Sequence, residues 1–215
     1  MLLIFNIFEL GIKEGKKNAY VAVGKNNITK SVLNDKGTLG MYLVQEKENP
    51  NMTYMFEVYE DEKSYQKHIK SEQYKEFLRQ SPTILTNHKK KIQVMPEYMG
   101  DKKFVQTRNT RVNYVTVDVK EGFNDAFREI VLDEMKQSIK KEEGVYVIYA
   151  ATTTENPNKW YFFEIYENEK AYQKHRKTAH FKKYIEQTEN IIENKEFINI
   201  EGVKLLNKGN LNYVK

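Results

Sequence analysis

The sequence contains no cysteine, so disulfides, thiolate nucleophiles and cysteine-based metal sites are excluded. Histidine is also scarce, with four residues among 215. No apolar run approaches the roughly 20 residues that span a bilayer. The apolar start, Met1–Phe5, lacks a basic leader and a small-residue cleavage site, so it predicts a strand rather than a signal peptide. We expect a cytoplasmic protein with no membrane partner.

Several common site patterns are missing as well. The sequence has no glycine-rich nucleotide loop, no Ser-His-Asp pattern and no cluster of metal ligands at a recognisable spacing. The net charge of +5 comes from 35 basic residues set among 30 acidic ones. The longest basic cluster, His88–Lys91, is short and has no interleaved aromatic residue, which favours a solvated face over a nucleic-acid site. We expect no nucleic-acid partner.

One segment of the chain occurs twice. Residues 57–68 (EVYEDEKSYQKH) return as residues 164–175 (EIYENEKAYQKH), with nine of twelve positions identical at a constant offset of 107. A gapless match of this length indicates an internal repeat. The Lys-Glu-Gly turn at residues 13–15 and the Asn-Pro-Asn turn at residues 49–51 recur at the same offset. We therefore predict two domains, residues 1–105 and 106–215, each long enough for its own core.

The order of predicted elements is the same in both halves. In the first half, the sequence predicts strands over residues 2–10, 41–44, 53–59 and 91–98, and helices over 19–33, 61–68 and 71–79, the last ended by Pro82. In the second half, it predicts strands over 112–119, 145–151, 160–166 and 197–206, a helix over 123–141 and further helices up to about residue 190. The order β-α-β-β-α-β is that of a ferredoxin-like α+β fold.

A four-stranded sheet with helices on one side leaves its other face bare. Here that face carries large apolar side chains, which must be covered. We expect the two halves to pair with each other, sheet to sheet, as an intramolecular pseudo-dimer with a barrel-like core. Further oligomerisation of the chain stays open.

The second copy of the repeat continues as Tyr172-Gln-Lys-His175-Arg-Lys-Thr-Ala-His180-Phe-Lys-Lys-Tyr184. An aromatic strand end, a short acidic turn and then His-x-x-Thr-x-His-Phe-Lys-x-Tyr resemble the antibiotic biosynthesis monooxygenase domain, and within it the quinol-monooxygenase-like proteins are most similar. The resemblance covers both halves. It implies a dimeric α+β barrel and, as in some members, oxygenation of quinols or anthrones by O2 with no metal, flavin or other cofactor.

Such chemistry requires little of the protein, because the substrate supplies the electrons. The protein excludes water, holds the ring and removes a phenolic proton. The expected partners are therefore a small aromatic molecule and O2. Two alternatives stay open, a non-catalytic protein that binds a small hydrophobic ligand and a heme-binding member. A related branch degrades heme with an Asn, a Trp and an axial His; His175 and Ile185 stand at the Trp and His positions, so that triad is missing.

The histidines are the main catalytic candidates. His175 and His68 are equivalent, and each lies one helical turn after a tyrosine, which is Tyr172 in the second copy. Imidazole titrates near neutral pH, so it suits a general base or a hydrogen-bond donor to a phenol. The alternative is a helix-end histidine bonded to backbone. His180 occurs only in the second copy, where the first has Gln73, so the second half is the better equipped one.

His175 and His180 are five residues apart and do not share a helical face. They can converge only if the helix breaks between them, as residues 177–179 allow. No carboxylate or third ligand sits at a supporting spacing, so the sequence predicts no metal site. The predicted catalytic pair is His175, as proton acceptor, with His180 beside it.

The predicted ligand contacts come from strands and helix ends near the histidines. Asn6 and Asn113 align on an apolar strand face, where an amide needs a ligand or backbone partner. Glu57 and Glu164 lie mid-strand among aromatic residues, as a base of raised pKa or as ion-pair partners. Trp160 has no counterpart in the first half, so any pocket that it shapes is confined to the second. The predicted substrate-binding residues are Asn113, Trp160, Tyr166, Tyr172, His68 and Asn6.

Overall fold

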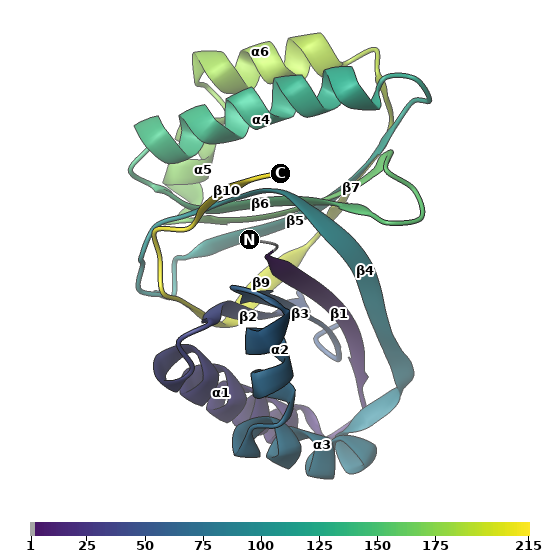
Figure 1. The fold of residues 1–215 in the computed structure, drawn as a ribbon, viewed down its shortest axis with the longest axis vertical. Helices are drawn as coiled ribbons and strands as arrows, with labels where there is room; N and C mark the ends of the chain where they lie inside the picture. The colour runs from purple at the N-terminus through teal and green to yellow at the C-terminus, as the bar shows by residue number, and fades with distance from the viewer. Residues whose placement is uncertain (1–2) are drawn as a thin grey trace. The chain divides into compact units, whose positions relative to one another are not determined.

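The computed structural model of the chain describes residues 3–215 (Figure 1). The first two residues of the chain, where the predicted N-terminal strand begins, lie outside the described residues. The first repeat consists of β1 (Ile4–Ile12), α1 (Lys17–Asn34), β2 (Thr38–Glu46), β3 (Met52–Tyr59), α2 (Glu62–Ile69), α3 (Glu72–Ile84) and β4 (Leu85–Asp101).

The second repeat has the same order and two further strands. It consists of β5 (Arg111–Val119), α4 (Asn124–Lys141), β6 (Val145–Thr153), β7 (Lys159–Tyr166), α5 (Glu169–His175), α6 (Ala179–Thr188), β8 (Ile192–Ile198), β9 (Ile200–Asn207) and β10 (Asn212–Val214). The predicted fold class, α+β with two β-α-β-β-α-β repeats, is confirmed. Among residues 3–215, no helix combines the length and the apolar character needed to cross a bilayer.

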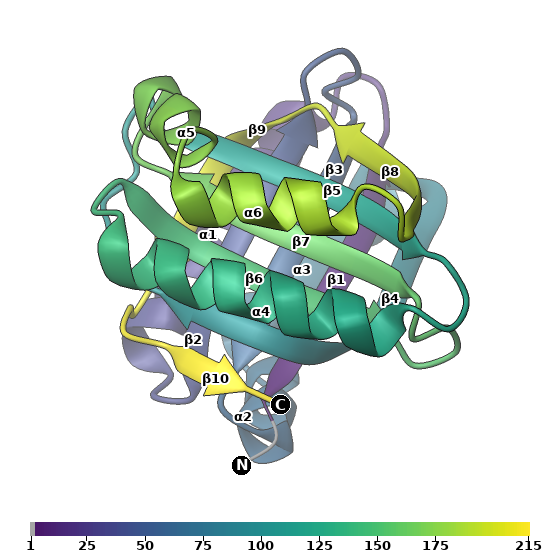
Figure 2. The ribbon, with the colours of Figure 1, turned by 90° about the horizontal axis from the view of Figure 1, so that it is seen from above.

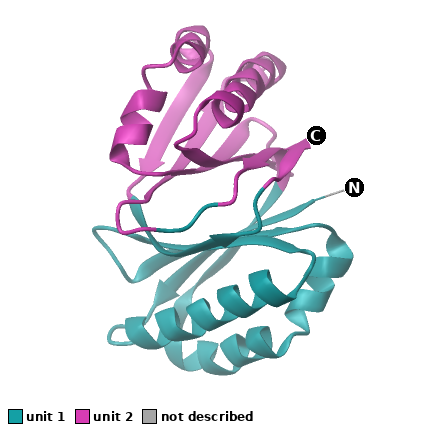
Figure 3. Ribbon diagram, turned by 90° about the vertical axis from the view of Figure 1, so that its left-hand side faces the viewer, with its two compact units in different colours: residues 1–94, 104–106, 200–209 teal, residues 95–103, 107–199, 210–215 magenta. Residues whose placement is uncertain are grey.

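The chain forms two compact units, and these are interleaved along the sequence (Figure 3). Unit 1 comprises Met1–Val94, Phe104–Gln106 and Ile200–Gly209, and unit 2 comprises Met95–Lys103, Thr107–Asn199 and Asn210–Lys215. The predicted division at residues 105 and 106 follows the repeat, whereas each compact unit also contains a strand segment from the other repeat. A strand offers hydrogen bonds on both edges, so the sheet takes up these additional strands.

Each unit has one five-stranded path. In unit 1 the strand order is β4-β1-β3-β2-β9, and in unit 2 it is β8-β5-β7-β6-β4, with β10 pairing the end of β4. Asn6 is opposite Glu57 in the antiparallel β1–β3 pair, and Asn113 is opposite Glu164 in the antiparallel β5–β7 pair. Both units therefore place an amide beside a carboxylate at the same point of the sheet.

The predicted end of the chain differs from the observed one. A single last strand was expected over residues 197–206, but β8 ends at Ile198 and β9 begins at Ile200. These two strands belong to different units, β8 pairing β5 and β9 pairing β2. A continuous apolar pattern cannot reveal this change of partner, because both strands satisfy the same local pattern.

Two boundaries in the first repeat also differ from prediction. Pro82 does not end the third helix, because α3 includes it and continues to Ile84. The carbonyl of Leu78, which loses its usual N–H partner to the proline, accepts the Ser81 hydroxyl at 3.0 Å instead. β4 begins six residues before its predicted start, since its first half is a polar edge strand on which His88–Lys91 are exposed.

The repeated turns have a common physical cause. Gly15 and Gly122 adopt φ values of 73° and 81°, a backbone conformation that residues with a Cβ rarely adopt. The following helices, α1 and α4, each run for 18 residues. In unit 2, α4 and α6 lie side by side across the sheet (Figure 2), and α1 packs on α3 in unit 1.

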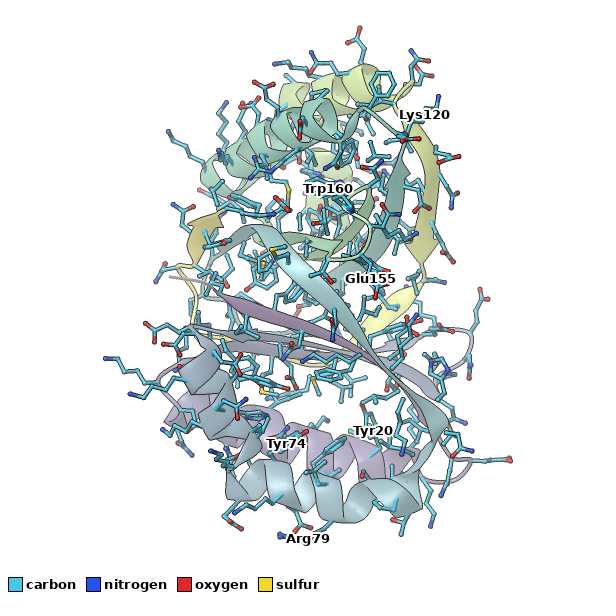
Figure 4. All side chains as sticks on the ribbon, turned by 45° about the vertical axis from the view of Figure 1, so that its right-hand side comes forward. Tyr20, Tyr74, Arg79, Lys120, Glu155 and Trp160 are labelled. Atoms are coloured by element: carbon cyan, nitrogen blue, oxygen red, sulfur yellow. The ribbon has the colours of Figure 1, made fainter. Side chains whose placement is uncertain are left out.

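The helix-facing cores of the two units contain different aromatic residues. In unit 2, Trp160 is fully buried, and its indole N–H donates to Asn124 Oδ1 at 2.8 Å. In unit 1 the same position is Thr53, whose hydroxyl lies 3.1 Å from the hydroxyl of the buried Tyr20. Figure 4 shows both aromatic side chains directed between sheet and helices. Trp160 is therefore a core residue with a satisfied polar atom.

His68 is buried in unit 1 at the end of α2. Its ring centroid lies 5.3 Å from that of Tyr59 and 5.1 Å from that of Tyr74. Neither ring nitrogen has a hydrogen-bond partner among the described residues. Burial lowers the pKa of His68 to about 4, against a smaller opposing effect of Asp35. The imidazole is therefore neutral in the folded protein.

Acidification should destabilise unit 1 through His68. Below about pH 6.5 the unfolded chain binds a proton at this position, whereas the folded protein resists it down to about pH 4. The stability that the neutral imidazole gives is complete above about pH 6.5 and is lost as the pH falls. His68→Phe removes this group, so its free energy of unfolding relative to wild type should rise by about 2 to 3 kcal/mol between about pH 7.5 and about pH 4.5.

Urea unfolding of both proteins at several pH values measures this difference. Taking the difference separates His68 from carboxyl groups that titrate in the same range. His88→Gln, at a half-exposed histidine, is the matched control for the loss of one imidazole. A difference for His68→Phe that does not change with pH, or that is no larger than the control's, would contradict the prediction.

Candidate active site

A cavity of about 370 Å³ lies inside unit 2, between the sheet and its helices. Strands β5, β7 and β8 form one side of it, and α4, α5 and α6 form the other. Apolar side chains such as Val117, Phe162 and Phe181 line much of its wall. The size and the lining suit a small aromatic molecule. The ionisable groups in the wall include Glu134, Glu164, His175, Arg176 and Lys195.

A break between two helices positions both predicted catalytic histidines. α5 ends at His175, and α6 begins at Ala179. The backbone N–H and the hydroxyl of Thr178 both donate to the carbonyl of His175, at 3.0 and 2.7 Å. The Thr178 hydroxyl also accepts the N–H of Phe181 at 3.3 Å and caps α6. The break that the sequence allowed is present, and it brings the two rings to 6.4 Å between centroids.

Both histidines contact one carboxylate. Oε1 of Glu142 accepts from Nδ1 of His175 at 3.0 Å and from Nε2 of His180 at 2.7 Å. Glu142 is the residue that follows α4 and is nearly buried. A buried carboxylate that accepts from two imidazoles has its charge compensated by those two hydrogen bonds.

A second carboxylate completes the cluster. Glu134 lies on the buried face of α4, and its Oε1 is 3.8 Å from Nε2 of His175. The same oxygen accepts the hydroxyl of Ser138 at 2.6 Å, one turn further along the helix. His175 therefore lies between two carboxylates, Glu142 on one nitrogen and Glu134 facing the other. Along the chain, the sequence showed no carboxylate at a supporting spacing from the histidines, and this was an argument against a metal site. In the folded chain, two carboxylates lie beside His175, so that argument does not hold.

The cluster shifts the pKa values of its members in different directions. Burial raises the pKa of Glu134 to about 7, although the charge of His175 and the Ser138 hydroxyl oppose this. Burial alone would lower the pKa of His175, but the bond to Glu142 and the neighbouring carboxylates leave it above its usual value. Burial also works against ionised Glu142, but the bonds from His175 and His180 bring its pKa below its usual value. His175 is therefore a hydrogen-bond donor near neutral pH.

A second polar network lies at the sheet side of the cavity. Oε2 of Glu164 accepts from Nδ2 of Asn113 at 3.1 Å and from the hydroxyl of Tyr166 at 2.8 Å. Oδ1 of Asn113 in turn accepts from Nε of Arg111 at 3.0 Å. The guanidinium of Arg111 also stacks on the ring of Tyr172, 4.3 Å from its centroid. These bonds fix the Glu164 carboxylate against the cavity.

The structure separates the predicted contact residues into groups. Tyr172 and His175 line the cavity directly. Asn113 and Tyr166 reach it through Glu164, and the Tyr166 ring also packs against His175 at 5.3 Å. Trp160 is not in the cavity wall. His68 and Asn6 belong to unit 1 and lie outside this site.

A second cavity of about 430 Å³ borders the cluster from the side of α4 and α6. Glu134 and His180 line it, together with surface residues such as Lys183 and Gln187. Glu134 therefore borders both cavities. His175 and His180 open to different sides of the cluster.

Unit 1 carries the same backbone with different side chains. At the constant offset of 107, Glu134 corresponds to Asn27 and His180 to Gln73. Gln73 donates to Oδ2 of Asp35, the counterpart of Glu142, at 3.2 Å. Asp35 pairs with Lys67 rather than with His68. Unit 2 therefore has a glutamate and a histidine at the two positions where unit 1 has the amides Asn27 and Gln73.

Glu134 and Glu142 are the site residues that reasoning from the sequence missed. Both lie on or next to a helix far from the histidines in sequence. A signal was present, because Glu134 interrupts the apolar face formed by Phe127, Val131 and Met135. Comparison of the two repeats position by position would also have found it.

The sequence profile of the antibiotic biosynthesis monooxygenase family matches residues 3–80 and again residues 110–187. The two matches together cover most of the chain and correspond to its two repeats. No curated protein matches the chain.

Two solved structures match over the whole chain. A proposed monooxygenase from Lactobacillus acidophilus NCFM has 28% sequence identity and a TM-score of 0.94, with 99% of this chain and 100% of that chain covered. A proposed monooxygenase from Fusobacterium nucleatum has 29% identity and a TM-score of 0.93, with 100% and 98% covered. An anthrone oxidase-like protein, at 10% identity and a TM-score of 0.56 over 96% and 97%, shares the fold.

Removal of the shared carboxylate should destabilise unit 2. Glu142→Gln leaves two buried imidazoles without their anionic partner, so we expect a loss of about 3 kcal/mol in the free energy of unfolding. Asp35→Asn is the matched change in unit 1, and it should cost about 1 kcal/mol or less, because its ion-pair partner Lys67 is largely exposed. Urea unfolding near neutral pH measures both. Equal losses in the two variants would show that the cluster has no special role in stability.

Proposed function

The chain belongs to the antibiotic biosynthesis monooxygenase family, and we propose that unit 2 oxidises a small aromatic, quinol-type substrate with O2 and without a cofactor. The observation that supports this most is an aromatic-lined cavity whose wall contains a buried carboxylate and an imidazole, Glu134 and His175. The two whole-length relatives, both proposed monooxygenases, support the reaction class.

The first step is removal of a phenolic proton. His175 was the acceptor expected from sequence, but its Nδ1 already bonds Glu142. Glu134 is the carboxylate that faces the other nitrogen and borders the cavity. In the proposed division of roles, Glu134 accepts the proton, and His175 donates a hydrogen bond to the substrate anion. Such a base and donor pair typically contributes about 100-fold or more to a rate.

The substrate then supplies all the electrons. Its anion transfers one electron to O2, and the two radicals combine to a peroxide. Loss of water leaves a new carbonyl group. For a ring CH2 group the sum is CH2 + O2 → C=O + H2O, so one oxygen atom enters the product and the other leaves as water. The apolar wall, with Phe162 and Phe181, excludes bulk water from the anion.

Positive groups at the cavity favour an anionic substrate. Arg176 and Lys195 both line it, each 5.8 Å from the centroid of an aromatic ring, Tyr172 and Tyr184 respectively. These cations partly offset the carboxylates of Glu134 and Glu164 in the same wall. A phenolate bound near Arg176 and Lys195 is stabilised by their positive charges, because the attraction is stronger at short distance and where the dielectric is lower than in water.

Catalysis is proposed for unit 2 alone. The counterpart of Glu134 is Asn27, whose amide cannot accept a proton at neutral pH, and its Oδ1 is 3.3 Å from the Ser31 hydroxyl. His68, the counterpart of His175, has no carboxylate at either ring nitrogen among the described residues. The two units therefore provide an internal comparison between an equipped and an unequipped copy.

Oxygen uptake tests the proposal. Reduced quinols and anthrone-like phenols, with no added cofactor, should be consumed above their autoxidation rate by the wild-type chain. Glu134→Gln and His175→Gln should each reduce the enzymatic rate about 100-fold or more. The matched change in unit 1, His68→Gln, should leave it near the wild-type value.

The outcomes separate the main alternatives. Equal loss in His175→Gln and His68→Gln would contradict a single active site in unit 2. No uptake with any substrate, together with an aromatic ligand that co-purifies with the chain, would overturn the enzymatic proposal in favour of a non-catalytic binding protein.

A further inference from the structure

We propose that Glu134, His175 and His180 form a binding site for one divalent transition-metal ion in unit 2. One donor atom from each of these three side chains lies within 4.8 Å of the other two. The exposed fractions of the side chains are 8%, 3% and 8%. Two imidazoles and one carboxylate form a donor set that zinc, iron, cobalt and nickel accept.

The spacing between two of the donors is that of a bridged pair. Nε2 of His175 and Oε1 of Glu134 are 3.8 Å apart, which is too long for a hydrogen bond. An ion about 2.1 Å from each atom fits between them with a bent angle. An ion can therefore bridge Nε2 of His175 and Oε1 of Glu134, although the two atoms are too far apart to hydrogen-bond directly.

Neighbouring groups already orient two of the three donors, His175 and Glu134, as a metal site requires. Nδ1 of His175 donates to Glu142 at 3.0 Å, which leaves Nε2 as the nitrogen that faces Glu134. A carboxylate behind a ligating imidazole fixes its tautomer and raises its basicity. The Ser138 hydroxyl, 2.6 Å from Oε1 of Glu134, holds that carboxylate in the same way.

The site has two routes of entry. Glu134 and His180 line the cavity between α4 and α6, and Glu134 and His175 line the cavity above the sheet. A buried ligand set needs such a path if an ion is to enter the folded protein. Glu134, which borders both cavities, is the point at which the two paths meet.

Comparison with unit 1 indicates how many metal ions the chain binds. Its counterparts to the three ligands are Asn27, His68 and Gln73, so two of the three donors are amides. An amide is a weak ligand for these ions compared with an imidazole or a carboxylate. The chain should therefore bind one ion, although the motif occurs twice.

Metal binding at this site does not require the proposed oxygenase reaction. A bound ion would occupy the carboxylate of Glu134 and Nε2 of His175, which the reaction also uses, so the two states compete for the same atoms. Binding can be measured with no substrate present. Its failure would leave the oxygenase proposal standing, and the failure of oxygen uptake would leave the metal site standing.

Titration with Co²⁺ tests the site on the full-length chain, prepared without a histidine tag. We expect visible ligand-field absorption that saturates at one Co²⁺ per chain and is removed by Zn²⁺. Glu134→Gln and His180→Gln should abolish this absorption. Glu142→Gln, which removes no ligand but takes away the carboxylate that both histidines contact, should weaken binding about 10- to 100-fold. His88→Gln, at the half-exposed histidine in unit 1, is the matched control and should change nothing.

The His180→Gln variant distinguishes loss of the metal site from unfolding of the protein. It gives unit 2 the residue that unit 1 already has, where Gln73 bonds Asp35 in place of a histidine. Circular dichroism should therefore match wild type while the absorption is lost. No absorption in wild type, or absorption that survives in both Glu134→Gln and His180→Gln, would overturn the proposal.

Discussion

The break between α5 and α6 is the constraint on which the site depends. The hydroxyl of Thr178 caps α6 and donates to the last carbonyl of α5, so two short helices meet at a fixed angle. This geometry turns a five-residue spacing into a contact, with His175 and His180 on one oxygen of Glu142. A continuous helix would have pointed the two rings to different faces.

The two units show how one backbone supports two chemistries. In both, a buried histidine lies in the last turn of the first short helix, and a strand carboxylate lies opposite an asparagine. In unit 1 burial dominates, and His68 is neutral. In unit 2 the bond to Glu142 and the nearby carboxylates of Glu134 and Glu164 outweigh burial, so that His175 holds its proton more tightly.

Prediction from sequence succeeded where the signal is local. The repeat and the order of elements follow from spacing and turn residues, and the structure has them. It failed where partners are distant. Ile198 and Ile200 look like one strand but pair in different units. Pro82 looks like a helix end, but the Ser81 hydroxyl satisfies the carbonyl of Leu78, so the helix continues.

By itself the sequence determined the α+β class, the duplication and the family resemblance, because hydrophobic period, turn chemistry and a repeated motif are properties of adjacent residues. It also indicated His175 and His180 as candidate catalytic residues, which stays a prediction. Only the tertiary structure decided that Glu134 and Glu142 join them and that Trp160 is core. The reason is that α4 lies far away in the chain, and packing against the sheet decides which of its residues reach the histidines.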